Sequence, residues 1–366
     1  MPTPKGFAKL LPDLWHMRRD YDQPPCVGVN AHHRSLPKQQ GQAQYGENGD
    51  HDCNAHAHAT AVYGGFRPAA AVHFAMPNTS PEIPAHSTQG DTPISPIALA
   101  SPVALITGAG SGIGRAVALG LARKGWRILA VGRRMQPLRE TISLCEEAQR
   151  EQAQSELAQH EQAQYEQVKS ERTQAPGGAA FSCDVGDAAA CRDAVNHAYA
   201  RLGRLDALIN NAGHAPKLPI QEHTIEVIAE TFAINAIGPA NMMVQAISRW
   251  TASDANNKQA FSPAIVNVGS MSTIDPFPGF FAYAASKASL NLLTRSCHNE
   301  LASAGVRCFT VSPGAVDTPL LRSIFPAEVL PTSKTLTPEA VAKVIIECVL
   351  GTRDAQQGEV IVVPSP

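Results

Sequence analysis

The stretch V-A-L-I-T-G-A-G-S-G-I-G at residues 103–114 decides the fold of this chain. It opens on five residues, VALIT, that predict a buried strand, and it passes through a glycine-rich turn into a helical pattern over about 113–124. A glycine-rich turn in this position lets the backbone approach a phosphate group, and the helix N-terminus behind it presents free N–H groups. The stretch therefore predicts a nucleotide-binding turn.

Short apolar runs and helical patterns alternate along the rest of the chain. The runs are RILAV (127–131), ALIN (207–210), AIVNV (264–268), CFTV (308–311) and EVIVV (359–363), with a further helix starting at about 136. Strands that alternate with helices predict βαβ units and a parallel sheet with helices on both faces. The predicted fold class is α/β, a Rossmann-type doubly wound parallel sheet in a three-layer α/β/α arrangement.

Residues 1–102 differ in composition from the rest of the chain. They contain 13 of the 28 prolines and 8 of the 13 histidines, and Leu, Ile, Val and Phe together number only 15. This apolar share is below the roughly 20% under which a chain struggles to bury a core, so we expect a disordered extension followed by one domain over 103–366. Within that domain, the Gln/Glu-rich segment 146–174 predicts a solvated helical insertion.

Charge and hydropathy exclude several classes of partner. The formal net charge is −2, and no dense block of one sign suggests nucleic acid or a membrane surface. The longest apolar stretches fall short of the roughly 18 residues of a membrane span, and the N-terminus lacks the pattern of a secretory signal. We expect a cytoplasmic protein.

The eight cysteines are scattered and form no CxxC pair, which favours reduced thiols over disulfides or a zinc site. His51, Cys53, His56 and His58 are metal-ligand types, but no periodic structure surrounds them, so we interpret them as a His-rich coil without a metal.

The residues after the second predicted strand bear on cofactor choice. RILAV ends at Gly132, where an acidic residue would bind an adenosine ribose and favour NAD. Arg133 and Arg134 follow instead, and a guanidinium suits the 2′-phosphate of NADP through bidentate, charge-assisted bonds. The alternative is a solvated basic pair at a helix start. The sequence favours NADP(H) over NAD.

Tyr283 and Lys287 lie four residues apart, hence on one face of a helix. A cation about 4 Å from a phenol favours the phenolate by up to about three pKa units, which makes the pair a sensible acid/base unit near neutral pH. By spacing alone, a surface tyrosine beside a surface lysine is an equally good interpretation.

Six features together resemble the short-chain dehydrogenase/reductase family. In the family's order, the chain has T-G-A-G-S-G-I-G (107–114), N-N-A-G (210–213), Asn235, Ser270 thirteen positions before Tyr283, the Y-x-x-x-K itself and S-P-G (312–314). The resemblance covers about 103–363 and leaves the N-terminal extension and the Gln/Glu-rich insertion without counterparts.

The resemblance implies roles for particular residues. Tyr283 would be the general acid in reduction or the base in oxidation, Lys287 would lower its pKa and hold the nicotinamide ribose, Ser270 would bind the substrate oxygen, and Asn235 would anchor a relay water. Asp184 would hold the adenine, although it is also a typical turn residue. The implied cofactor-binding set is Thr107, Gly108, Ser111, Gly112, Ile113, Gly114, Arg133, Arg134, Asp184, Val185, Asn210, Ala212, Gly213, Tyr283, Lys287, Pro313, Gly314, Val316 and Thr318.

The expected function is NADPH-dependent reduction of a ketone or aldehyde, and the expected partner is a small carbonyl compound or alcohol. An NAD-dependent alcohol dehydrogenase and a non-catalytic NADP-binding regulator or scaffold are the alternatives. Phe277, Phe280 and Phe281 would form an apolar pocket wall, and the short stretch between Thr318 and Pro338 predicts a reduced lid over an open pocket. Family members also suggest a homodimer or homotetramer.

Overall fold

The computed structural model of the protein describes residues 101–157, 178–252 and 262–366. The expectations for the disordered extension, for the His-rich segment at 51–58 and for insertion residues 158–174 lie outside these ranges.

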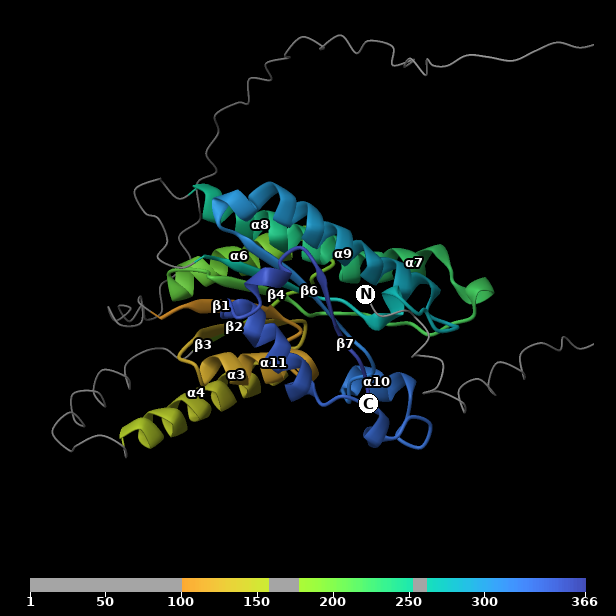
Figure 1. The fold of residues 1–366 in the computed structure, drawn as a ribbon, viewed down its shortest axis with the longest axis horizontal. Helices are drawn as coiled ribbons and strands as arrows, with labels where there is room; N and C mark the ends of the chain where they lie inside the picture. Colours follow the sequence, from red (N-terminus) through yellow and green to blue (C-terminus); the bar gives the residue numbers. More distant parts are fainter. Residues whose placement is uncertain (1–100, 158–177, 253–261) are drawn as a thin grey trace, which may run out of the picture. The chain divides into compact units, whose positions relative to one another are not determined.

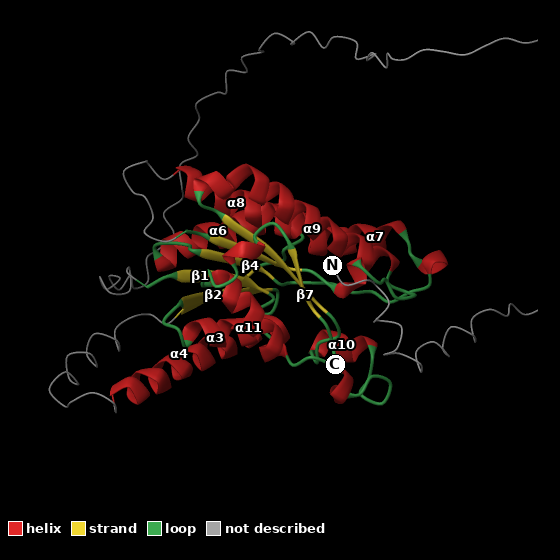
Figure 2. Ribbon diagram, viewed as in Figure 1, coloured by secondary structure: helices red, strands yellow, loops and turns green. Residues whose placement is uncertain are grey.

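The described residues form one parallel sheet in the order β3-β2-β1-β4-β5-β6-β7, with every neighbouring pair parallel. Figure 2 shows the strands as a twisted central layer between helices. The order reverses direction between β1 and β4, which confirms the predicted doubly wound Rossmann-type fold. The strands are β1 (Val103–Thr107), β2 (Arg127–Gly132), β3 (Gly178–Ser182), β4 (Ala207–Asn210), β5 (Ala264–Val268), β6 (Arg307–Pro313) and β7 (Val360–Val363).

Helices cover both faces of the sheet (Figure 1). One face carries α3 (Gly112–Ala122), α4 (Met135–Leu157) and α11 (Pro338–Val349), and the other carries α6 (Ala188–Leu202), α8 (Gly238–Ala252) and α9 (Phe281–Leu301). Each face encloses its own apolar cluster. The central strands are continuous apolar runs because both of their faces are buried. The shorter helices α7 (Ile225–Phe232) and α10 (Pro319–Ile324) lie near the carboxyl ends of the strands.

The edge strand β3 is the one strand that the sequence analysis does not predict. Its sequence, GAAFS, consists mostly of small residues that are weak strand formers, and its side chains are only partly buried. A Cβ atom at Gly178 would lie 2.5 Å from the Ile128 carbonyl oxygen, so a residue without a side chain suits this close pairing with β2.

The described start of the Gln/Glu-rich insertion continues α4 without a break. Cys145 and Ala148 are buried, and Gln149 donates a hydrogen bond to the Trp126 carbonyl at 2.9 Å. From Arg150 to Ser155 most side chains are exposed. The helix therefore packs on the domain through its first half and extends into solvent beyond it.

One continuous helical stretch, Ile225–Ala252, has the length and apolar composition of a membrane span. It comprises α7, a π-helical turn over Ala233–Ile237 and α8. Met242, Ala246 and Trp250 are buried in an apolar cluster together with residues of α6 and α9, as in a core helix of a globular protein.

Candidate active site

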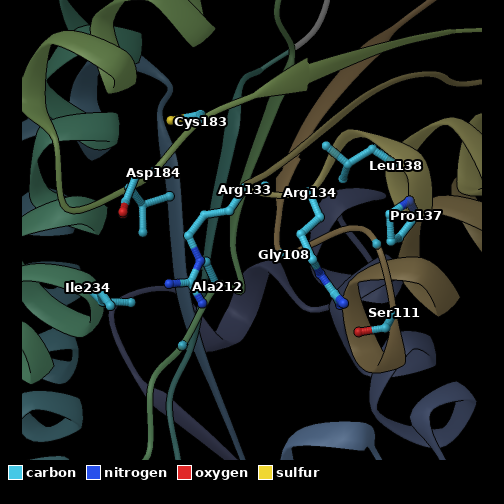
Figure 3. Close-up of a pocket in the computed structure, with 14 residues that line it drawn as sticks. Gly108, Ser111, Arg133, Arg134, Pro137, Leu138, Cys183, Asp184, Ala212 and Ile234 are labelled. Carbon is cyan, nitrogen blue, oxygen red and sulfur yellow. The ribbon is translucent and has the colours of Figure 1, made fainter.

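The site lies at the carboxyl edge of the sheet, where the strand order reverses between β1 and β4. Loops that follow the two strands diverge there and leave a crevice, which is the usual ligand position in such sheets. Figure 3 shows this pocket. Its lining residues come from the glycine turn, the end of β2, the end of β3 and the loop after β4: Gly108, Gly110, Ser111, Gly132, Arg133, Arg134, Pro137, Leu138, Cys183, Asp184, Val185, Ala212, Gly213 and Ile234.

The glycine turn is packed too closely to admit side chains. Gly108 has a φ of +65°, and a Cβ atom there would lie 3.0 Å from the Ala212 Cα atom. A Cβ atom at Gly114 would lie 2.5 Å from the Gly108 carbonyl oxygen. These glycines bring the first turn of α3 against the end of β1, as a phosphate-binding turn requires.

Side chains from two neighbouring elements hold the turn in place. Asn211 donates hydrogen bonds from its amide to the carbonyl oxygens of Thr107 at 2.9 Å and Gly108 at 3.3 Å. Arg115 donates to the Gly110 carbonyl at 2.6 Å and to the Thr141 hydroxyl at 3.0 Å. Sequence reasoning missed Arg115, because its partners on α4 are distant along the chain.

The N-terminus of α3 is free to bind an anion. Ser111 precedes the helix in extended conformation, and its hydroxyl makes no capping hydrogen bond to the first-turn N–H groups. Uncapped donors at the positive end of a helix dipole favour a phosphate. Because the turn also has no Cβ atoms, these residues fit the pyrophosphate of a dinucleotide.

Arg133 and Arg134 extend from the end of β2 into the pocket (Figure 3). Both side chains are exposed, and neither pairs with an acidic side chain in the described part of the chain. An unpaired cation pair in a nucleotide pocket is a suitable partner for an additional phosphate group.

Asp184 is a turn residue that also belongs to the pocket lining. Its carboxylate accepts a hydrogen bond from the Gly186 N–H at 3.0 Å, as a turn residue does, and it also lines the pocket beside Val185. Figure 3 places it on the opposite side of the pocket from Ser111.

The other residues of the implied cofactor set lie around the pocket rather than in its lining. Thr107 accepts hydrogen bonds from the N–H groups of Asn211 and Ala212 at 2.9 and 3.0 Å, and Asn210 donates to Asn267 at 2.8 Å in the core. Gly112, Ile113 and Gly114 form the first turn of α3. Pro313 ends β6, and Gly314, Val316 and Thr318 follow it, with Thr318 capping α10.

Helix α9 places Tyr283 and Lys287 one turn apart. Lys287 is only 4% exposed, and its ammonium donates a hydrogen bond to the Val268 carbonyl at 2.8 Å. A Cβ atom at Gly213 would lie 3.6 Å from both the Lys287 Nζ atom and the Asn235 Oδ1 atom. These two polar groups therefore lie directly behind the pocket wall formed by Gly213.

Asn235 is fully buried in the π-helical turn, and its amide makes three hydrogen bonds to protein groups. Its Oδ1 atom accepts from the His214 N–H at 2.8 Å, and its Nδ2 atom donates to the His214 carbonyl at 2.7 Å and the Ser286 hydroxyl at 3.0 Å. The side chain thereby fixes the loop after β4 against α9. π-Helical turns occur frequently at functional sites.

Burial dominates the acid/base properties of the Tyr283–Lys287 pair. It lowers the pKa of Lys287 from 10.5 to about 8. Burial also raises the pKa of Tyr283 above its ordinary value, and the hydrogen bond with the Ser270 side chain opposes that increase. The role expected of Lys287, to lower the pKa of Tyr283, stays a prediction.

Aromatic residues form a wall beside Tyr283. The Phe280 ring is 8% exposed and lies 5.5 Å from the Tyr283 ring and 6.2 Å from the Phe325 ring, measured between centroids. Phe277 and Phe281 are 44% and 51% exposed. Of the three phenylalanines expected to form this wall, Phe280 alone has a ring contact with Tyr283, and Phe325 after α10 joins it.

No group of three or more His, Cys, Asp or Glu side chains within the described ranges is arranged to hold a metal ion.

The chain matches the family model described as short chain dehydrogenase over residues 102–171 and 142–329. It is 31% identical to general stress protein 39 of Bacillus subtilis over 227 residues, covering 62% of this chain and 68% of that protein. It is 30% identical to D-threitol dehydrogenase of Mycolicibacterium smegmatis over 247 residues, covering 66% and 82%. It is also 37% identical to 2,3-dihydro-2,3-dihydroxybenzoate dehydrogenase of Escherichia coli over 142 residues, covering 39% and 54%.

Solved structures give the same relationship at the level of the fold. A short chain dehydrogenase/reductase family protein has a TM-score of 0.56 at 25% identity, covering 72% of this chain and 95% of that one. A 3-ketoacyl-(acyl-carrier-protein) reductase from Brucella melitensis complexed with NADH has a TM-score of 0.59 at 24% identity, covering 73% and 98%. The chain thus belongs to the short chain dehydrogenase family and is an NAD(P)-dependent oxidoreductase acting on alcohol or carbonyl groups.

Proposed function

We propose that the protein reduces a ketone or aldehyde with NADPH and that Tyr283 delivers the proton. The observation that carries the cofactor assignment is the pair Arg133 and Arg134, which enters the pocket with no acidic partner in the described chain. The reaction direction follows from this preference, because NADPH is commonly the reductant in carbonyl reduction.

The chain's own residues supply binding and proton transfer. The glycine turn and the N-terminus of α3 would hold the pyrophosphate, Asp184 and Val185 the adenine side, and Lys287 the nicotinamide ribose. When bound, NADPH supplies a hydride. The Ser270 hydroxyl, which hydrogen-bonds Tyr283, orients the carbonyl oxygen, and the phenol protonates that oxygen as negative charge develops on it.

The protonation state of Tyr283 suits this direction. Burial raises the pKa of its phenol, which therefore carries at neutral pH the proton that reduction consumes. Lys287, with its pKa near 8, loses its charge as the pH rises through that value, so its hold on the ribose and its support of a developing phenolate weaken there.

Two of the similar proteins are named for different substrates, D-threitol and 2,3-dihydro-2,3-dihydroxybenzoate. Their names therefore do not select a substrate for this chain. The aromatic wall of Phe280 and Phe325 supports a substrate with an apolar body.

Two further proposals concern the setting of the enzyme. The described cysteines, Cys145, Cys183, Cys191, Cys297, Cys308 and Cys348, are free and buried, which supports a reducing, cytoplasmic environment. Exposed apolar side chains on the π-helical turn, α8 and α9 support a homodimer or homotetramer; they are Ile237, Val244, Phe281 and Leu292.

Arg133→Ala is expected to weaken NADPH binding at least tenfold and to leave NADH binding unchanged, because a charged hydrogen bond is worth about 1.5–3 kcal/mol. Fluorescence titration of both cofactors measures this. Arg139→Ala is the matched control, since Arg139 is an exposed arginine of α4 outside the pocket lining. Equal affinity of the wild type for both cofactors would refute the NADP assignment.

Gly132→Asp tests the same assignment in the opposite direction. A Cβ atom at Gly132 would meet Leu138 at 3.5 Å, an ordinary contact, and Gly132 is not among the glycines with positive φ. An acid therefore fits at the end of β2, and we expect it to shift preference toward NADH.

A further inference from the structure

Lys217 lies against the aromatic wall beside Tyr283 and has no acidic partner among the described residues. It belongs to the loop after β4, and its Nζ atom sits 4.4 Å from the centroid of the Phe325 ring. Phe325 contacts Phe280, and Phe280 contacts Tyr283. The ammonium is thus two ring contacts away from the residue proposed to donate the proton.

Three features hold the Lys217 side chain in this position. Gly279 has a φ of +87°, and a Cβ atom there would lie 3.0 Å from the Lys217 Cγ atom, so the lysine stem occupies space that only glycine leaves free. The Leu218 N–H donates to the Gly279 carbonyl at 3.0 Å and ties this loop to the start of α9. The Phe325 ring then receives the ammonium in a cation–π contact.

The lid segment that carries Phe325 is itself anchored. Arg322 donates to the Asp317 carboxylate at 2.7 Å and to the Leu330 carbonyl at 2.6 Å, while Thr318 caps α10. Asp317, at the start of this segment, is therefore paired with Arg322 and does not neutralise the charge of Lys217. The lid segment contacts the loop after β4 through Phe325 and Lys217.

We propose that Lys217 is a specificity-determining residue that selects substrates with a carboxylate at the end of an apolar body remote from the carbonyl that is reduced. This inference rests on the proposed reductase function. The Phe280 and Phe325 rings would contact the apolar body, and the ammonium would pair with the carboxylate. A single ammonium balances one negative charge, which favours a carboxylate over a phosphate dianion.

Oxo acids compared with their methyl esters test this proposal. The substrates are 4-oxocyclohexanecarboxylate, 4-acetylbenzoate and 6-oxoheptanoate, each assayed with NADPH beside its methyl ester. In at least one pair the wild type is expected to show a kcat/KM about tenfold higher for the acid, the effect of one charge-assisted hydrogen bond. Lys217→Met should remove that preference by raising KM for the acid while leaving the ester unchanged.

Lys217→Met keeps most of the apolar contacts of the side chain and removes only its charge. Lys217→Arg keeps the charge and should retain most of the preference for the acid. Lys343→Met, on the exposed side of α11, is the control. Equal rates for acids and esters in the wild type would overturn the proposal, and so would an equal loss for both in Lys217→Met. If no acid or ester is reduced although NADPH binds, the proposed reductase function fails and this inference fails with it.

Discussion

Tyr283→Phe is expected to lower turnover by about 10²–10⁴ while NADPH affinity stays near that of the wild type. The substitution keeps the ring and its contact with Phe280 but deletes the hydroxyl that bonds Ser270. Without that hydroxyl, no other group has been assigned to protonate the carbonyl oxygen. Stopped-flow measurement of nicotinamide oxidation gives the turnover, and fluorescence titration gives the affinity.

Tyr199→Phe is the matched control for this experiment. Tyr199 lies on α6 beside Arg249, and burial raises its pKa to about 12. Loss of its hydroxyl removes a phenol remote from the site, so turnover should be unchanged. Near-normal turnover in Tyr283→Phe would refute the proton assignment and favour a non-catalytic, NADP-binding role.

Lys287→Met is expected to abolish most turnover and weaken cofactor binding, yet to stabilise the fold. Burial depresses the pKa of the ammonium from 10.5 to about 8, so keeping it charged at neutral pH costs about 3 kcal/mol. Loss of the hydrogen bond to Val268 offsets part of the gain. With about 2–4 °C per kcal/mol in a domain of this size, Tm should rise by a few degrees.

The expected stabilisation by Lys287→Met depends on pH. Between about pH 8 and 10.5 the unfolded chain holds the Lys287 proton and the folded chain does not, so wild-type stability rises with pH in this window. The Tm advantage of Lys287→Met should therefore be full below pH 8 and shrink above it. If Lys287→Met had a lower Tm than the wild type at neutral pH, and if that difference in Tm did not change with pH, burial of the charged lysine would not be destabilising.

Most of the fold follows from local sequence patterns. β1 and β4 have the bounds predicted from VALIT and ALIN, because a strand buried on both faces is a continuous apolar run. β3 escapes prediction because GAAFS carries no such run and its position depends on pairing with β2. The start of the insertion is helical as its composition suggests, but only the fold shows that its first residues pack on the domain.

The site is less accessible to sequence reasoning because its contacts join distant segments. The spacing of Tyr283 and Lys287 predicts one helix face, but the depth of burial, which sets the direction of both pKa shifts, depends on the whole domain. The contact of Phe325 with Phe280 and the placement of Lys217 over that ring require the lid and the loop after β4 to meet. No local sequence pattern predicts this contact between the two segments.

Deuteride transfer tests the central claim most directly. The purified protein is mixed with NADPH deuterated at the transferable nicotinamide position and a panel of ketones and aldehydes, and the alcohols are analysed by mass spectrometry. We expect one deuterium on the carbinol carbon of a product, a slower transfer than with unlabelled NADPH, and loss of labelled product in Tyr283→Phe. Binding of NADPH with no labelled alcohol from any carbonyl would contradict it.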